Sequence, residues 1–84
     1  MTEQQQSDLA AVIQAKVASG LLPKDAPAKF WAGYGSGKVC DACDLSISLA
    51  GIEYEVDMAD ERTFRFHAAC LTLWHQERAA YLQP

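Results

Sequence analysis

Cys40-Asp41-Ala42-Cys43 and His67-Ala68-Ala69-Cys70 are the two stretches of sequence that decide the fold. Together they hold all three cysteines of the chain and one of its two histidines, and 23 residues separate them. Each stretch carries two soft metal ligands with two residues between them, so a tight turn or the first turn of a helix can aim both at one point. The pattern C-x2-C…H-x2-C therefore predicts a closed Cys3His site that binds one structural Zn²⁺ per chain through Cys40, Cys43, His67 and Cys70.

Other uses of the cysteines fit this pattern less well. A disulfide framework prefers an even number of cysteines in a secreted chain, and a thioredoxin-like C-x-x-C belongs beside a βαβ pattern. A c-type haem needs His directly after the second cysteine, where this chain has Asp44. An iron–sulfur cluster held by four cysteines would lack one thiolate. Redox-active thiols and buried thiols without metal remain as the alternatives to zinc.

The length of the chain agrees with a metal-stabilised fold. We expect residues 1–84 to form a single domain, and a hydrophobic core of this size contributes only a few kcal/mol. A structural zinc ion can add on the order of 10 kcal/mol of apparent folding free energy. The ion is therefore expected to be part of the fold rather than an addition to it.

Charge and hydropathy exclude several classes of protein. The formal net charge of −4 argues against a general nucleic-acid-binding surface, which needs clustered Lys and Arg. No apolar run approaches the ~18 residues of a membrane span. The polar N-terminal residues lack the basic and apolar segments of a signal peptide, and unpaired cysteines fit a reducing compartment. We therefore expect a cytoplasmic protein without a membrane segment.

The N-terminal part, residues 1–20, is expected to hold one amphipathic helix over residues 7–19. Its apolar residues recur at helical spacing, and Gly20 is placed to end it. The apolar stripe either completes the core of the zinc module, which is the favoured interpretation, or docks a partner. The residues of this stripe are Leu9, Val12, Ile13 and Val17.

Residues 21–38 are expected to be a connector without regular structure, because prolines and glycines recur along it. Its three aromatic residues are too apolar for a solvated linker. We expect Phe30 or Trp31 to insert into the core; alternatively Phe30, Trp31 and Tyr34 form an exposed partner-binding patch. The glycine-rich run before Cys40 fails the phosphate-binding motifs and is interpreted as a flexible approach to the first ligand pair.

Residues 39–82 are expected to form the zinc module. After a Cys knuckle, the alternating segments 52–56 and 63–66 predict an antiparallel β-hairpin, and residues 68–82 predict a helix that carries Cys70 in its first turn. Asp41 and Asp44 are expected to face solvent. His75 lies five residues beyond Cys70, too far around the helix to be a ligand. The whole chain is thus a small, zinc-stabilised α+β domain.

This order of a knuckle, a hairpin and two ligands at the start of a helix resembles treble-clef zinc domains. The spacing C-x2-C-x23-H-x2-C is similar to the first zinc module of LIM domains, with Ile47 and Phe66 at places where that pattern carries apolar residues. A LIM domain would continue with a further ligand pair three residues past Cys70, where this chain has Leu73, so the second module is absent. The resemblance implies a structural zinc and protein–protein contacts.

Residues 20–78 also resemble small bacterial zinc-binding proteins with a glycine-rich approach, C-x2-C, a Tyr-containing strand and Phe-His-x2-Cys-x3-Trp. This second resemblance carries no activity with it.

The sequence favours a protein–protein interaction or adaptor module and no enzyme, because four good ligands leave no open position for water on the metal. The carboxylates lack a spacing that specifies acid–base chemistry. One alternative is a nucleic-acid-binding zinc-finger regulator, although the seven basic residues are dispersed along the chain. A second alternative is a redox sensor in which thiolate oxidation releases the metal. The identity of the partner and the oligomeric state stay open.

Overall fold

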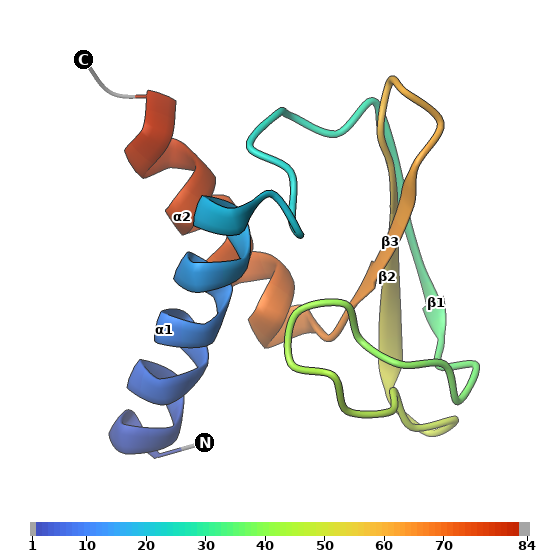
Figure 1. The fold of residues 1–84 in the computed structure, drawn as a ribbon. Coiled ribbons are helices and arrows are strands. Elements are labelled where there is room, and N and C mark those ends of the chain that lie inside the picture. Colours follow the sequence, from blue (N-terminus) through green and yellow to red (C-terminus); the bar gives the residue numbers. More distant parts are fainter. Residues whose placement is uncertain (1, 83–84) are drawn as a thin grey trace.

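A computed structural model of the chain describes residues 2–82 and contains two helices and one antiparallel sheet. In Figure 1 the helices lie on one side of the molecule and the sheet lies on the other. Helix α2 contacts α1 and also contacts strands β2 and β3, so it joins the two halves. The predicted small α+β class is confirmed. The elements follow in the order α1 (Glu3–Ser19), β1 (Lys29–Tyr34), β2 (Ile52–Asp57), β3 (Thr63–Phe66) and α2 (Ala68–Leu82).

Helix α1 begins four residues earlier than the sequence analysis predicts, at Glu3 instead of residue 7. The reason is a capping box between Thr2 and Gln5. The Gln5 N–H donates to Thr2 Oγ1 at 3.2 Å, and the Thr2 N–H donates to Gln5 Oε1 at 3.0 Å. These bonds satisfy backbone groups that a helix N-terminus otherwise leaves unpaired. The helix ends as predicted at Gly20, whose φ of 86° favours glycine.

The buried stripe of α1 is narrower than predicted. Ile13 and Val17 are fully buried and Leu9 is half-buried, whereas Val12 is 44% exposed. Because α1 packs along α2, these side chains complete the core, and the favoured interpretation of the stripe is confirmed. Neither helix in the described part of the chain combines the length and hydropathy needed to cross a membrane.

The centre of the core is the pair Trp74 and Phe66, whose ring centroids lie 5.0 Å apart in a stacked arrangement. The Trp74 indole N–H donates to the Pro23 carbonyl at 2.9 Å, so the buried polar atom of the ring is satisfied. This bond also fixes the segment after α1 against α2. The other buried apolar residues are Ile13, Val17, Leu22, Cys40, Ala42, Ile47, Val56, Met58, Cys70, Leu71 and Leu73.

The prediction of a connector without regular structure over residues 21–38 is wrong, because this segment contains strand β1. The predicted antiparallel hairpin of β2 and β3 is confirmed, and β1 extends it to a three-stranded sheet of order β1-β2-β3. Both prolines, Pro23 and Pro27, precede the strand, so neither removes one of its N–H groups. An isolated two-stranded hairpin is marginally stable in water. Pairing of β1 with the other edge of β2 supplies the third strand, in a register that places Phe30 opposite Val56.

The aromatic residues of β1 do not enter the core, so the expectation that Phe30 or Trp31 inserts there is also wrong. Phe30 is 57% exposed, Trp31 is 50% exposed and Tyr34 is 82% exposed. Within residues 2–82 neither helix contacts β1, which extends beyond the part of the sheet that α2 covers. Because side chains alternate along a strand, Phe30 and Tyr34 share one face while Trp31 lies on the other.

The glycine-rich run before Cys40 is tightly packed at Gly35, so it is not flexible along its whole length. A Cβ built on Gly35 would lie 1.8 Å from the Ser48 carbonyl oxygen, so only glycine fits there. The Gly35 N–H donates to the Gly51 carbonyl at 2.9 Å and extends the pairing of β1 with the start of β2. This contact holds the loop that leads to Cys40 against the sheet.

Candidate metal centre

The two predicted ligand pairs meet at one point. Cys40 and Cys43 lie in the knuckle, His67 follows β3, and Cys70 lies in the first turn of α2. One ligand atom from each residue belongs to a cluster whose atoms all lie within 4.8 Å of one another. Cys40 and Cys70 are buried, whereas Cys43 and His67 are half-buried. The structure therefore brings together all four side chains that the spacing indicates.

The distances within the cluster fit a metal ion. The His67 Nδ1 lies 3.4 Å from Cys43 Sγ and 3.9 Å from Cys70 Sγ. Zn–S bonds of about 2.3 Å and Zn–N bonds of about 2.0 Å at tetrahedral angles place sulfur and nitrogen about 3.5 Å apart. The two observed distances bracket this value. The Cys3His cluster could thus hold one metal ion at its centre.

The orientation of His67 identifies its ligand atom. Its Nδ1 faces the cysteine sulfurs, and its Nε2 lies 3.3 Å from the Ser46 backbone carbonyl oxygen. A carbonyl oxygen accepts only, so this contact places the ring proton on Nε2 and leaves a lone pair on Nδ1. A partner on the far ring nitrogen is the usual way in which proteins orient a metal-binding histidine.

The knuckle is a tight turn closed by backbone hydrogen bonds. The Asp44 N–H donates to the Cys40 carbonyl, and the Cys40 N–H donates to the Leu45 carbonyl, both at 2.9 Å. An isolated bridge between Val39 and Ser46 closes the base of the turn. Asp44 adopts a φ of 65°, a left-handed conformation that Asp tolerates better than most residues. The sequence after Cys43 thus lets the chain reverse while both sulfurs point inward.

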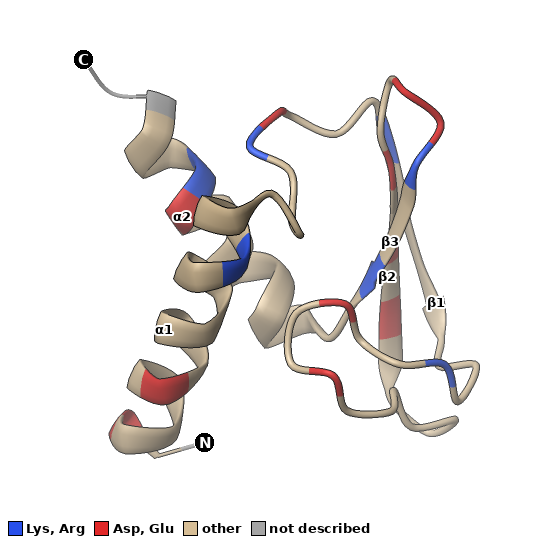
Figure 2. Cartoon of the chain, in the orientation of Figure 1, with Lys and Arg blue, Asp and Glu red and all other residues tan. Residues whose placement is uncertain are grey.

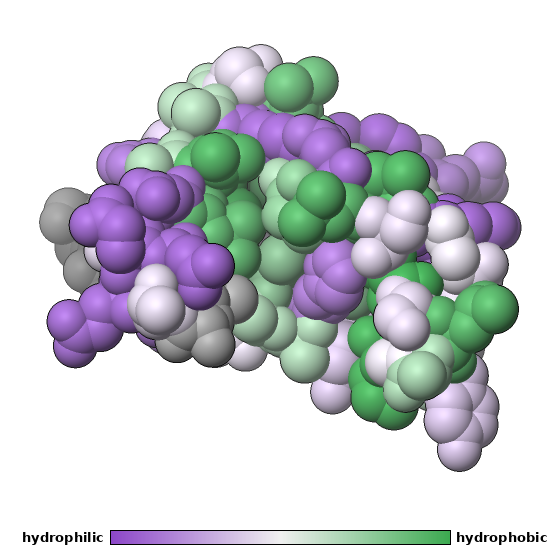
Figure 3. All heavy atoms as spheres, turned by 90° about the horizontal axis from the view of Figure 1, so that it is seen from below, coloured by the Kyte–Doolittle hydropathy of each residue, from purple (hydrophilic) through white to green (hydrophobic). Residues whose placement is uncertain are grey.

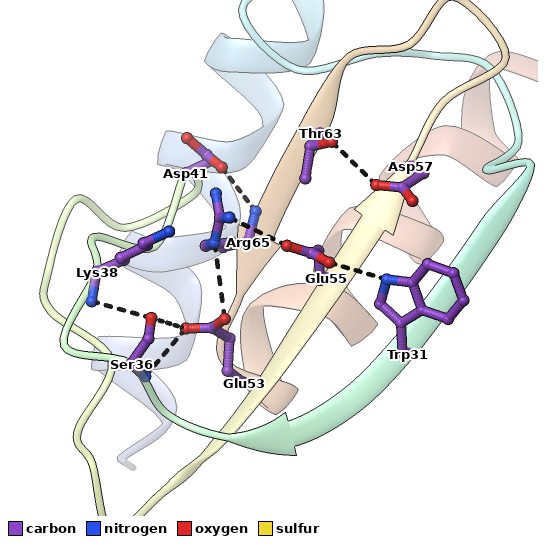
Figure 4. A network of polar contacts seen from close by, with 9 residues as sticks. All are labelled: Trp31, Ser36, Lys38, Asp41, Glu53, Glu55, Asp57, Thr63 and Arg65. Atoms are coloured by element: carbon purple, nitrogen blue, oxygen red, sulfur yellow. Dashed lines mark hydrogen bonds and ion pairs between the residues drawn. The ribbon is translucent and has the colours of Figure 1, made fainter.

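Asp41 joins the knuckle to β3. The Asp41 N–H donates to the Arg65 carbonyl at 2.8 Å, and the Arg65 N–H donates to Asp41 Oδ2 at 2.7 Å. Figure 4 shows the Asp41 carboxylate directed at the Arg65 backbone. Asp41 is half-buried, so the expectation that it faces solvent is wrong: its carboxylate completes the edge of β3, the strand that leads to His67. The exposed Asp44 does face solvent, as predicted.

Lys16 ties α1 to the same knuckle. Its Nζ donates to the Asp41 carbonyl oxygen at 3.0 Å and to both Asp44 carboxylate oxygens at 2.9 Å. The Lys16 side chain is 16% exposed, so its stem is packed while its charged end reaches the turn. Three parts of the chain, α1, the knuckle and β3, are therefore held together around the ligands.

The three thiols of the cluster differ in pKa. The hydrogen bond between Cys70 and Cys40 lowers the pKa of Cys40 to about 4 and raises the pKa of Cys70 above its ordinary value. Burial raises the pKa of Cys43. Only one thiolate is thus stable among the protein groups alone, and a divalent cation is what would allow all three to ionise together.

A groove of about 480 Å³ lies beside the cluster and gives it contact with solvent on one side. Its walls include Cys43, His67 and Cys70, and the remaining lining is mainly apolar. The cluster is therefore enclosed on the side of the core and open on the side of α1. The other lining residues are Gln5, Leu9, Leu45 and Ala69.

His75 is not a member of the cluster, in agreement with the prediction from its spacing. Its ring lies 5.2 Å from the Trp74 ring, and its Nδ1 lies 2.9 Å from Arg78 Nη2. Burial, assisted by the positive charge of Arg78, lowers the pKa of His75. The His75 side chain thus packs against Trp74 and Arg78 on helix α2.

The spacing in the sequence identifies the four clustered side chains but says little about the polar contacts around them. Lys16 has no distinguishing signal in the sequence, and Asp41, between two cysteines, was expected to face solvent. One feature of the sequence pointed to such a contact. Arg65 lies in an alternating segment two residues before His67, and the outward backbone groups of an edge strand need hydrogen-bond partners.

Comparison of the chain with protein-family models, curated proteins and solved structures gives no match.

Proposed function

We propose that this protein is an interaction module whose fold is stabilised by one structural Zn²⁺ bound to Cys40, Cys43, His67 and Cys70. The observation that carries the proposal is the meeting of these four ligand atoms within 4.8 Å. Three thiolates and one imidazole favour zinc over the harder cations, which prefer oxygen ligands. Four protein ligands complete a tetrahedral shell, as in structural zinc sites, and leave no position for a catalytic water.

The similarity to treble-clef and LIM zinc modules supports the same proposal. In this chain the knuckle carries Cys40 and Cys43, the strands β2 and β3 follow it, and His67 and Cys70 come just before and just inside the start of α2. Domains of this layout serve as scaffolds that present a surface to other proteins. Here the exposed aromatic residues of β1, with Trp31 on one face of the sheet and Phe30 and Tyr34 on the other, offer contacts to a partner, since aromatic residues are enriched at interface hot spots.

The distribution of charge favours a protein partner over a nucleic acid. Figure 2 shows the basic residues separated from one another and mixed with acidic ones. Lys16, Arg62 and Arg65 each lie within 4 Å of a carboxylate. Phosphate binding needs clustered, available cations, and the net charge of −4 opposes it.

An affinity capture experiment with the zinc-loaded protein tests the interaction role. Trp31→Ala should weaken capture of the partner while the zinc content stays at one per chain. Leu21→Ala is the matched control, because Leu21 is 67% exposed but lies outside β1. Equal capture by wild type and Trp31→Ala would remove β1 as the binding surface, and salt-resistant binding to DNA would favour the regulator instead.

A further inference from the structure

The two edges of the sheet differ in how their backbone groups are satisfied. At the β3 edge, the outward N–H and C=O of Arg65 are both bonded to Asp41. At the β1 edge, the Gly35 N–H bond to Gly51 fixes which residues face β2, and alternation along the strand then turns the N–H and C=O groups of Phe30, Ala32 and Tyr34 outward. The β3 edge is therefore covered at Arg65, whereas the β1 edge is open along its centre.

The open edge lacks the usual protection of an edge strand. All six residues of β1 are exposed, and within residues 2–82 neither helix contacts the strand. Its only charged residue is Lys29, at the first position, and its only proline neighbour, Pro27, precedes it. Natural proteins block such edges with charges, prolines or bulges, because an open edge pairs with another chain. The centre of β1 has none of these.

We propose, building on the interaction role above, that β1 pairs antiparallel with β1 of a second copy of this chain about a two-fold axis at Ala32. The two three-stranded sheets then join into one continuous sheet. Residues that face each other across an antiparallel two-fold have numbers that sum to a constant. With Ala32 opposite Ala32 of the other copy, Phe30 lies opposite Tyr34, and all the outward backbone groups of the strand face one another.

The side chains of β1 are self-complementary in this register. On the face shared with Val56, an aromatic pair, Phe30 with Tyr34 of the other copy, lies on each side of the two small Ala32 residues. On the opposite face, Trp31 lies opposite Gly33 of the other copy, so no side chain of the other copy faces the indole directly across the strand pair. A register centred on Phe30 or on Tyr34 would leave outward backbone groups of the strand without partners.

The surroundings of the edge are compatible with a second copy despite the net negative charge. The carboxylates of Glu53 and Glu55, which lie opposite the centre of β1, are already engaged by Arg65, and Glu55 also accepts from the Trp31 indole N–H at 2.9 Å (Figure 4). The apolar side chains left uncovered include Ile52, which lies opposite Tyr34 in the sheet and is 47% exposed. Figure 3 shows hydrophobic residues, in green, interspersed with hydrophilic ones on the face seen from below.

Sedimentation velocity of the zinc-loaded protein over a wide concentration range tests this inference. The key variant is Ala32→Pro, which removes an outward N–H and leaves the ladder between β1 and β2 intact, since an edge strand tolerates proline there. Ala32→Ser is the matched control because it keeps the N–H. Wild type and Ala32→Ser should shift from monomer to dimer as concentration rises, and Ala32→Pro should stay monomeric with unchanged zinc content and circular dichroism.

Amide hydrogen exchange locates the interface in the same samples. The amides of Phe30, Ala32 and Tyr34 should exchange more slowly as the protein dimerises, while the amide of Gly33, which already faces β2, should not change. A wild-type chain that stays monomeric at all concentrations, or that dimerises without slowing these amides, overturns the inference. A monomer that still binds a protein partner through Trp31 removes the second copy but leaves the proposed function standing.

Discussion

Asp41 and Arg65 exchange two hydrogen bonds, one from each backbone N–H, and these bonds connect the two halves of the metal centre. Asp41 lies between Cys40 and Cys43, and Arg65 lies two residues before His67. The contact therefore sets the position of the first ligand pair relative to the second. The carboxylate acts here as a substitute for a neighbouring strand, since it accepts the N–H that a further strand would have bonded.

Asp41→Ala should lower the zinc affinity and the stability of the domain. The substitution leaves the half-buried Arg65 N–H without an acceptor, at a cost of about 1–3 kcal/mol. Loss of a residue that orients metal ligands lowers affinity by about 10–100-fold. Competition with a chromophoric chelator measures the affinity. Asp60→Ala is the control, because Asp60 is an exposed carboxylate of the loop between β2 and β3; equal affinities of the two variants would show that Asp41 does not position the ligands.

Lys16→Met should loosen α1 from the knuckle and leave the metal site intact. Methionine keeps the apolar stem in place, so the variant removes only the bonds to the Asp41 carbonyl and to Asp44. We expect a loss of about 1 kcal/mol in the free energy of unfolding, since an ion pair with an exposed partner contributes little. Chemical denaturation of the zinc-loaded protein gives the number. A loss of zinc in this variant would show that α1 is part of the site rather than a cover for it.

Removal of zinc should unfold the sheet and α2 together. Two members of the cluster, Cys40 and Cys70, belong to the hydrophobic core, and a core of this size is marginal without a metal. Helix α1 should survive only in part, because an isolated helix of this length is marginally stable in water. Circular dichroism and the dispersion of amide resonances, recorded before and after chelation, measure the change. A chelated protein with fully dispersed resonances would mean that the metal is incidental.

Zinc binding should release protons and weaken as the pH falls, because each thiol must ionise before it binds. In the folded site at pH 7, Cys40 is already a thiolate, since its pKa is lowered to about 4, whereas the raised pKa values of Cys43 and Cys70 keep those thiols protonated. A preformed site would thus release two protons. An unfolded chain, whose cysteines have ordinary pKa values of about 8.5, would release nearly three.

Because we expect folding to be coupled to metal binding, we predict the release of nearly three protons rather than two. Titration calorimetry at pH 7 in buffers of different ionisation enthalpy counts the protons. Release of only two would show that the site is formed before the metal binds.

The sequence predicts the four clustered side chains, the two helices and the strands β2 and β3, because each has a local signal. Two ligand pairs have a fixed spacing, Ile52–Val56 and Thr63–Phe66 alternate, and residues 68–82 lack glycine and proline. Strand β1 was not predicted, because an exposed edge strand has no alternation to reveal it and its pairing with β2 depends on partners 24 residues away at Trp31 and Glu55. Asp41, Arg65 and Lys16 were missed for the same reason: their roles exist only after the elements have met.

X-ray absorption at the zinc K-edge, on protein purified without added metal, tests the central claim most directly. The account predicts one zinc per chain with three sulfur ligands at about 2.3 Å and one nitrogen ligand at about 2.0 Å. His67→Ala should remove the nitrogen from this shell, and His75→Ala should leave it unchanged. An oxygen-rich shell, a nitrogen that is lost with His75, or a chain that carries no zinc would contradict the account.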